Sequence, residues 1–161
     1  MNLDRILGTC NQQGVSYLLI GGMNFLLRHQ PVLTYDVDLW IEDTPENRRR
    51  CESALAALDA EWGRTNADWG PVAAKPAGWL DQQAVYCLNS PHGAIDVFRS
   101  LKGPTDWQTS WNASVVEQTA AGTSYHGLSD ADMLACQLAL DAGAQKAERI
   151  RVLRSKLKSS P

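Results

Sequence analysis

Three aspartates lie in a pattern that could bind a divalent metal ion. Residues 35–41 alternate strictly, so a strand there places Asp36 and Asp38 on one face and Val37 and Leu39 on the other. Two carboxylates this close repel each other unless a cation or a proton lies between them. Asp96 has the same apolar–acidic–apolar setting in a later run. If the two strands are neighbours, the three carboxylates converge on one ion.

The chemistry that such a cluster suits is phosphoryl chemistry with Mg²⁺ or Mn²⁺. Mg²⁺ prefers a few carboxylates and keeps coordination positions for water and substrate phosphates. Two such ions would position an attacking oxygen, polarise the phosphorus and stabilise the leaving group. Asp96 would be a general base or a second-metal ligand. The structural alternative is three aspartates on an exposed sheet face, which the Gly-Gly pair upstream makes less favourable.

Gly21 and Gly22 lie between a predicted strand over 15–20 and a predicted helix over 23–28. Glycines at such a junction let a backbone approach phosphate oxygens, and the helix amino end offers free N–H groups. Asn24 follows and would reach a nucleotide or cap the helix. A Gly-Gly pair alone more often forms a tight turn, so the prediction of phosphate binding here depends on the aspartates downstream.

The elements that must position these residues form a small mixed sheet flanked by helices. Residues 62–81 are rich in Gly, Pro and Trp, and we expect a loop or irregular strand there that could line a cleft. We predict an α/β (α+β) fold in one domain over 1–161, with a sheet-containing core to about 103 and a mainly helical part over 104–161. The other predicted elements are helices 3–13, 44–58, 130–142 and 144–158, strands 84–88, 94–98 and 122–126, and a short helix with Trp107, Trp111 and Val115.

Charge is unevenly distributed along the chain. Residues 1–145 carry nine basic and seventeen acidic side chains, a balance of −8, whereas residues 146–161 carry six basic and one acidic, a balance of +5. We interpret the basic end as the solvated face of a final helix, with a phosphate-binding tail as the alternative.

The cysteines and the amino terminus indicate a reducing compartment. The four cysteines are scattered with no C-x-x-C, which argues against a disulfide framework or a zinc site. The start of the chain lacks the apolar segment of a signal peptide, and no apolar run is long enough to span a bilayer. We therefore expect a soluble, cytoplasmic protein with no membrane partner.

The whole spacing resembles a family signature. Gly21-Gly22, a spacer of thirteen residues and Asp36-Val37-Asp38-Leu39 resemble the nucleotidyltransferase-fold superfamily, above all small bacterial AbiEii-type toxins and related uncharacterised nucleotidyltransferases. The segment from Ile95 to Trp111 is similar to the third-carboxylate region there. Three positions depart from the pattern: Val32 where an Arg often precedes Thr34, Gln137 where a Lys is common, and Ala147 after Lys146 in place of an acid.

The resemblance implies a metal-dependent nucleotidyltransferase. An NTP would be bound with Mg²⁺ (or Mn²⁺), and its nucleotidyl group would pass to an RNA such as tRNA, a protein or a small molecule. The protein would then be a candidate toxin with an antitoxin partner. The implied catalytic and metal-binding residues are Asp36, Asp38 and Asp96, and the implied nucleotide-binding residues are Gly21, Gly22, Asn24, Thr34 and Lys146.

Two other functions compete with this interpretation. Nucleotide-sugar glycosyltransferases also use Asp-x-Asp with a divalent ion, but this chain is short for one and lacks a full nucleotide-binding half. A non-catalytic module on the same fold would bind a nucleotide or a partner protein, and the altered basic positions favour keeping that alternative.

Overall fold

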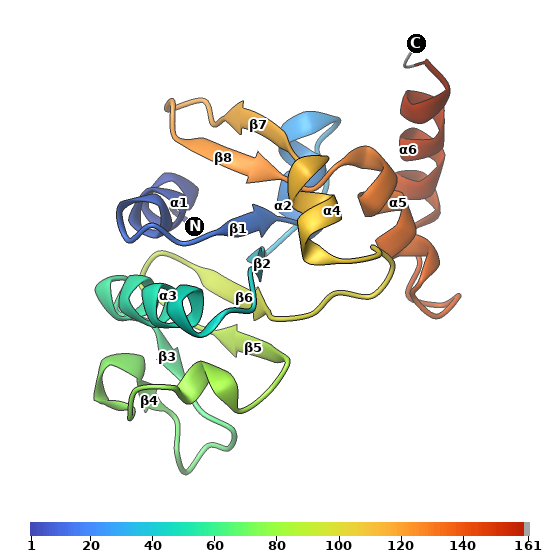
Figure 1. Cartoon of the computed structure of the whole chain (residues 1–161). Coiled ribbons are helices and arrows are strands. Elements are labelled where there is room, and N and C mark those ends of the chain that lie inside the picture. Colours follow the sequence, from blue (N-terminus) through green and yellow to red (C-terminus); the bar gives the residue numbers. More distant parts are fainter. Residues whose placement is uncertain (160–161) are drawn as a thin grey trace.

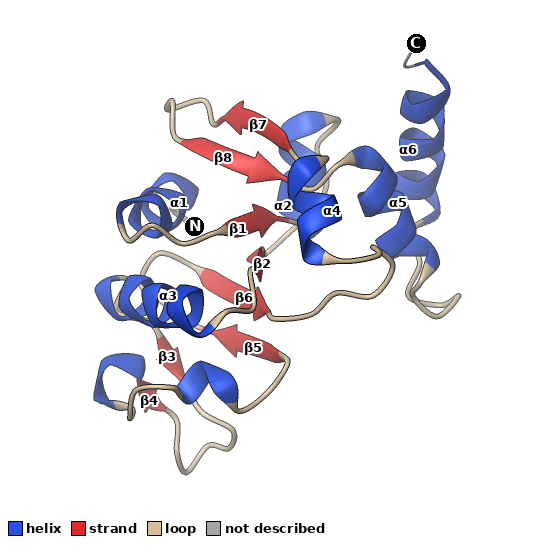
Figure 2. Cartoon of the chain, in the orientation of Figure 1, coloured by secondary structure: helices blue, strands red, loops and turns tan. Residues whose placement is uncertain are grey.

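The computed structural model describes residues 1–159 and contains a mixed six-stranded sheet with helices on both faces (Figures 1 and 2). The strand order is β5-β6-β2-β1-β8-β7. The strands are β1 (Tyr17–Leu19), β2 (Asp36–Ile41), β5 (Val85–Leu88), β6 (Ala94–Phe98), β7 (Val115–Gln118) and β8 (Ser124–Gly127).

Six α-helices and a small second sheet complete the described part of the chain. The helices are α1 (Leu3–Gln12), α2 (Gly21–Arg28), α3 (Pro45–Ala57), α4 (Trp107–Asn112), α5 (Asp130–Leu138) and α6 (Ala147–Ser159). The second sheet pairs β3 (Glu61–Trp62) with β4 (Gly70–Pro71), near two short 3₁₀ turns, η1 (Val72–Ala74) and η2 (Trp79–Asp81).

Side-chain caps begin four of these helices, and two of the caps are Thr44 and Ser129. The Thr44 hydroxyl accepts a hydrogen bond from the Asn47 N–H at 3.2 Å, and Pro45 occupies the first turn of α3. The Ser129 hydroxyl accepts from the Asp132 N–H at 3.2 Å at the start of α5. Each cap satisfies an N–H that the helix itself leaves without a partner.

The register of the central strands sets the positions of the aspartates. β2 pairs antiparallel with β1 and parallel with β6, and Asp38 lies directly opposite Asp96. The two acidic strands are therefore neighbours, which is the condition under which the three carboxylates converge. β5 and β6 form the expected antiparallel pair, in which Cys87 lies opposite Asp96.

The sheet separates two apolar clusters. On one face Val37, Leu39 and Ile41 are completely buried beneath α1 and α3. On the other face Trp40 and Leu18 pack with residues of α2, α5 and α6, and α4 adds its two tryptophans. In Figure 1 the pair α1 and α3 accordingly lies apart from α4, α5 and α6.

Three expectations about the C-terminal part and the middle of the chain differ from the structure. Val115 begins β7 instead of extending the helix before it, because a Val-Val pair favours a strand and α4 ends at Asn112. The sheet thus continues past 103, since β8 pairs in parallel with β1. Residues 62–81 do not line the cleft described below. Trp62 and Trp79 stack on each other with ring centres 5.4 Å apart, and both contact Tyr86 in the core.

The four cysteines carry free thiols, as the sequence predicts. Within residues 1–159, none of the helices combines the length and the apolar character needed to cross a bilayer.

Candidate active site

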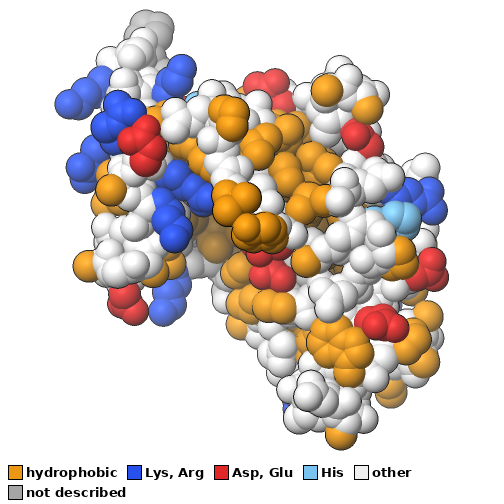
Figure 3. All heavy atoms as spheres, turned by 180° about the vertical axis from the view of Figure 1, so that it is seen from behind, with side chains coloured by type: hydrophobic (Ala, Val, Ile, Leu, Met, Phe, Trp, Pro, Cys, Tyr) orange, Lys and Arg blue, Asp and Glu red, His pale blue; other side chains and the backbone are white. Residues whose placement is uncertain are grey.

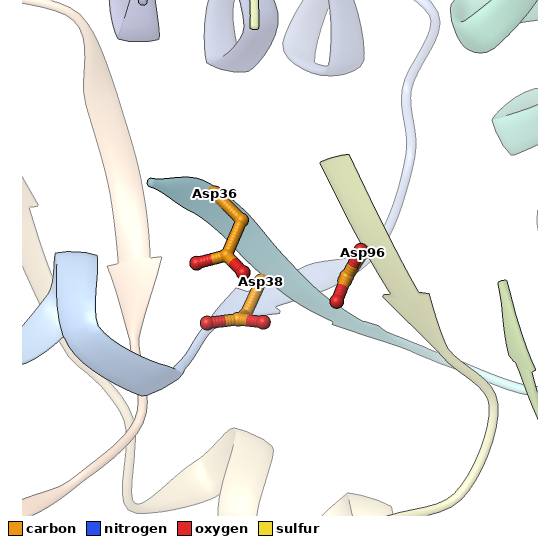
Figure 4. A group of neighbouring side chains, drawn as sticks. All are labelled: Asp36, Asp38 and Asp96. Carbon is orange, nitrogen blue, oxygen red and sulfur yellow. The ribbon is translucent and has the colours of Figure 1, made fainter. Parts of the chain in front are cut away.

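The three aspartates converge on one face of the sheet (Figure 4). Asp36 and Asp38 project from β2 and Asp96 from β6, and one carboxylate oxygen of each lies within 4.8 Å of those of the other two. All three side chains are half-buried. This spacing allows one divalent cation to contact all three carboxylates, which are the ligand type that Mg²⁺ and Mn²⁺ prefer.

The three carboxylates are partly buried, and their negative charges repel one another. Burial raises the pKa of Asp38 to about 7, and the neighbouring charges of Asp36 and Asp96 add to the shift, while Arg149 acts in the opposite direction. Burial also raises the pKa of Asp96, with a further contribution from Asp36. Because like charges in a half-buried site favour a proton or a cation between them, the electrostatics fit a metal site.

Both glycines are required by close approach of the backbone to this cluster. Gly21 has φ +66°, and a Cβ there would lie 2.0 Å from Asp38 Oδ2. A Cβ on Gly22 would lie 2.7 Å from the Thr34 hydroxyl and 3.0 Å from the Arg149 guanidinium. The Gly22 N–H donates a hydrogen bond to the Asp38 carboxylate. The amino end of α2 therefore meets the aspartates without any side chain between them, as phosphate binding at a helix terminus requires.

The remaining predicted nucleotide-binding residues lie in three different settings. The Thr34 hydroxyl donates to Asp36 Oδ1 at 3.3 Å and so holds that carboxylate. Asn24 is completely buried, and its amide nitrogen donates to the Leu128 carbonyl at 2.9 Å, which ties α2 to the start of α5. Lys146 is exposed just before α6, where its backbone N–H donates to Gln137 Oε1 at 2.9 Å. Neither Asn24 nor Lys146 lines the cleft beside the aspartates.

A cleft of about 700 Å³ opens beside the cluster, between the sheet and helices α5 and α6. Figure 3 shows a hollow with hydrophobic walls next to α6, along which Lys and Arg side chains gather on this face of the molecule. Its lining residues are Ile20, Gly21, Phe25, Asp38, Ala84, Val85, Phe98, Ser100, Leu101, Lys102, Leu128, Met133, Cys136, Gln137, Leu140, Arg149 and Leu153.

Sequence reasoning missed two residues near the aspartates. Arg149 reaches into the cleft, with its guanidinium 5.7 Å from the centre of the Phe25 ring. Its position four residues before the buried Leu153 was the available signal, because residues four apart share a helix face. Cys87 is an exposed thiol that hydrogen-bonds Asp96 from the neighbouring strand. No pattern in the sequence indicates that pairing.

Sequence comparison finds no protein family that matches the chain and no similar curated protein. Comparison of structures does find similar folds. A crystal structure of ANT(2'')-Ia in complex with adenylyl-2''-tobramycin matches at a TM-score of 0.51 and 14% identity, covering 96% of this chain and 94% of that one. A solution structure of the antibiotic-resistance factor ANT(2'')-Ia matches at 0.46 and 14% identity, covering 96% and 88%. At this identity the likeness concerns architecture, and the chain has a nucleotidyltransferase-like fold with a mixed six-stranded sheet.

Proposed function

We propose that this protein is a metal-dependent nucleotidyltransferase that transfers the nucleotidyl group of an NTP to an acceptor hydroxyl or phosphate. The observation that carries the proposal is the meeting of three carboxylates, within 4.8 Å of one another, with the amino end of α2. The nucleotidyltransferase-like fold supports the proposal, because the three carboxylates and the amino end of α2 lie on a sheet-and-helix scaffold similar to that of ANT(2'')-Ia.

The three aspartates and Thr34 have defined roles in this proposal. Asp36, Asp38 and Asp96 would hold Mg²⁺ or Mn²⁺. When bound, these ions would neutralise phosphate charge and favour in-line displacement at phosphorus. Thr34 orients Asp36 through its hydroxyl. Asp96 would also act as general base, accepting the proton of the acceptor hydroxyl as the hydroxyl oxygen attacks the α-phosphorus and the bond to pyrophosphate breaks.

The triphosphate would lie between the amino end of α2 and α6. Gly21 and Gly22 let the amino end of α2 approach Asp38 and Thr34 with no side chain in between, and Arg149 lies against Gly22 from the opposite wall of the cleft. We assign to Arg149 the cationic role that the family resemblance gives to Lys146, because the Arg149 guanidinium lies against Gly22 and acts on Asp38. Asn24 would contribute by anchoring α2 to the Leu128 carbonyl.

The biological setting is also part of the proposal. The resemblance to AbiEii-type proteins supports a cytoplasmic toxin with an antitoxin partner and an RNA or protein acceptor. The ANT(2'')-Ia complex holds an adenylylated small molecule, which supports a small-molecule acceptor. A non-catalytic nucleotide-binding module is the second candidate. It is favoured by Gln137, which lines the cleft and lies near the position where the family that the sequence resembles often has a Lys.

A transfer assay tests the proposal. Purified protein, MgCl₂ and each α-labelled NTP are incubated with fractionated RNA, protein and small molecules from lysate. We expect a labelled product with the wild type and a loss of about 10³-fold or more with Asp36→Ala, because a metal ligand has been removed. Asp141→Ala, an exposed carboxylate on the loop before α6, is the matched control and should retain activity.

Two further measurements decide between the candidates. Equal thermal midpoints for wild type and Asp36→Ala would show that lost activity is not lost folding. If the wild type binds nucleotide with metal but labels nothing, while a relative with the complete set of basic residues labels an acceptor under the same conditions, the non-catalytic module is the better description.

A further inference from the structure

The cleft beside the aspartates extends beyond the region where the phosphates would bind, and its further part is lined mainly by apolar side chains. Across the sheet, the strand order runs β5-β6-β2-β1. Gly21 and Asp38 therefore belong to its β1–β2 side, whereas Val85 and Phe98 belong to its β5–β6 side. If the phosphates of a nucleotide lie at Gly21, the β5–β6 side of the cleft remains open to a second ligand.

That second side is apolar. Its walls come from the end of β6 and from the facing surface of α5, and the polar side chains that line them are Ser100, Lys102 and Gln137. A ligand with an apolar body would bury hydrophobic surface there, at roughly 25 cal/mol per Å² of area removed from water. The apolar residues concerned are Ala84, Val85, Phe98, Leu101, Leu128, Met133 and Leu140.

The charges of the cleft select against cations. Asp38 is the one carboxylate among the lining residues, and the proposed function already assigns it to a metal. The other charged lining residues are Lys102 and Arg149. Lys102 makes no ion pair with any residue in 1–159, in contrast to Arg48 and Arg99, which both pair with Asp43. Ammonium groups placed here would meet apolar walls and like charges, both of which are unfavourable.

We infer that the β5–β6 side of the cleft binds a small acceptor with an apolar body and an anionic group. This inference rests on the proposed function and names the substrate class of the same site. The cleft volume of about 700 Å³ lies within the usual range for small-molecule sites. The apolar body packs between Phe98 and Leu140, the anionic group lies near Lys102, and the acceptor hydroxyl points toward the aspartates. A polycation such as tobramycin has no matching carboxylates here.

The test uses 8-anilinonaphthalene-1-sulfonate, a fluorescent apolar anion, as the probe. It is titrated into the whole protein saturated with Mg²⁺ and the non-reactive analogue α,β-methylene-ATP. We expect saturable binding at one site. Lys102→Glu should weaken it about tenfold, because an attraction becomes a repulsion at the rim. Leu140→Glu should weaken it as well. Both residues are exposed, so these variants should fold. Lys158→Glu, an exposed lysine of α6 outside the cleft, is the matched control and should stay within about twofold.

Several outcomes would overturn the inference. Saturable binding of the probe to the nucleotide-free protein that is lost in the presence of the analogue would assign the whole cleft to the nucleotide. Unchanged affinity in Lys102→Glu, or displacement by tobramycin at lower concentrations than by a hydroxylated aromatic carboxylate, would contradict the charge argument. Failure of nucleotidyl transfer is separate: a protein that binds the probe as expected but transfers nothing would contradict the proposed enzyme and leave the ligand class of the cleft in place.

Discussion

The two faces of β2 share one backbone and differ in chemistry. On one face Val37, Leu39 and Ile41 are completely buried under α1 and α3. On the other, Asp36 and Asp38 lie close enough to repel each other. The apolar face holds the strand in place, so the carboxylates cannot separate to relieve their repulsion. One face of β2 therefore contributes to the stability of the fold, and the opposite face carries the residues of the proposed chemistry.

The comparison predicts that substitutions on the two faces act in different ways. Leu39→Ala should lower the free energy of unfolding by about 2–5 kcal/mol, because it removes a fully buried side chain and leaves a cavity. Asp38→Asn should be neutral or stabilising in metal-free buffer, because it removes a charge from a repelling cluster. Urea titration monitored by circular dichroism measures both. A loss in Asp38→Asn as large as in Leu39→Ala would mean that the acidic face supports folding.

A second substitution tests how tightly the backbone closes on the acidic face. Gly21→Ala should destabilise the protein by about 1–3 kcal/mol, because φ is +66° and the new Cβ would overlap Asp38 Oδ2. It should also abolish the thermal shift produced by Mg²⁺, since Asp38 must move away. Gly143→Ala is the matched control: a Cβ there has open space, so its midpoint should change little. If Gly21→Ala keeps a wild-type response to Mg²⁺, the glycine and Asp38 are not coupled.

The alternation of β2 explains why one part of the molecule was predictable. Period-2 patterning placed Asp36 and Asp38 on one face, and the matching pattern around Asp96 indicated the partner strand. The caps of α3 and α5 follow from single residues, Thr44 and Ser129. Local rules of this kind depend only on residues near in sequence, so they can be applied without a structure.

The cleft wall was not predictable by the same rules. Arg149 reaches the aspartates because α6 packs across the sheet, and Asn24 is buried because α2 packs on the start of α5. Both outcomes depend on contacts more than one hundred residues apart, which no local pattern encodes. β7 was likewise missed, and the predicted strand over 122–126 could not be placed beside β1, because the pairing of β8 with β1 and of β7 with β8 is decided by the chain's return to the sheet.

A third prediction concerns pH. The carboxyl of Asp38 has a pKa of about 7 in the folded protein against an ordinary value of 3.8, so between these values the folded state binds more protons than the unfolded state. The metal-free protein should therefore lose stability as the pH rises from about 4 to 7. One pKa unit corresponds to about 1.4 kcal/mol, and we expect a total of about 1–2 kcal/mol because the coupled carboxylates share the effect.

Metal and substitution controls isolate the contribution of Asp38. Millimolar Mg²⁺ or Mn²⁺ should raise the thermal midpoint at pH 8 more than at pH 5, because protons compete with the ion at low pH. Asp38→Asn should flatten the pH dependence and weaken the response to metal. Thermal midpoints recorded by fluorescence from pH 4 to 8 give the comparison. Identical midpoints with and without millimolar metal at pH 8 would contradict a metal site.

The smallest expected effect concerns the thiol at the border between the acidic face and solvent. Cys87 is exposed on β5 opposite Asp96, and burial together with the Asp96 charge raises the pKa of its thiol to about 11. Since the thiolate is the reactive form, alkylation by iodoacetamide at pH 8 should be slow. Asp96→Asn should accelerate it severalfold, because the substitution removes the neighbouring negative charge. Peptide mass mapping follows the rate, with the buried Cys10 and Cys51 as unreactive internal controls. Equal alkylation rates in the wild type and Asp96→Asn would show that the charge of Asp96 does not affect the pKa of the Cys87 thiol.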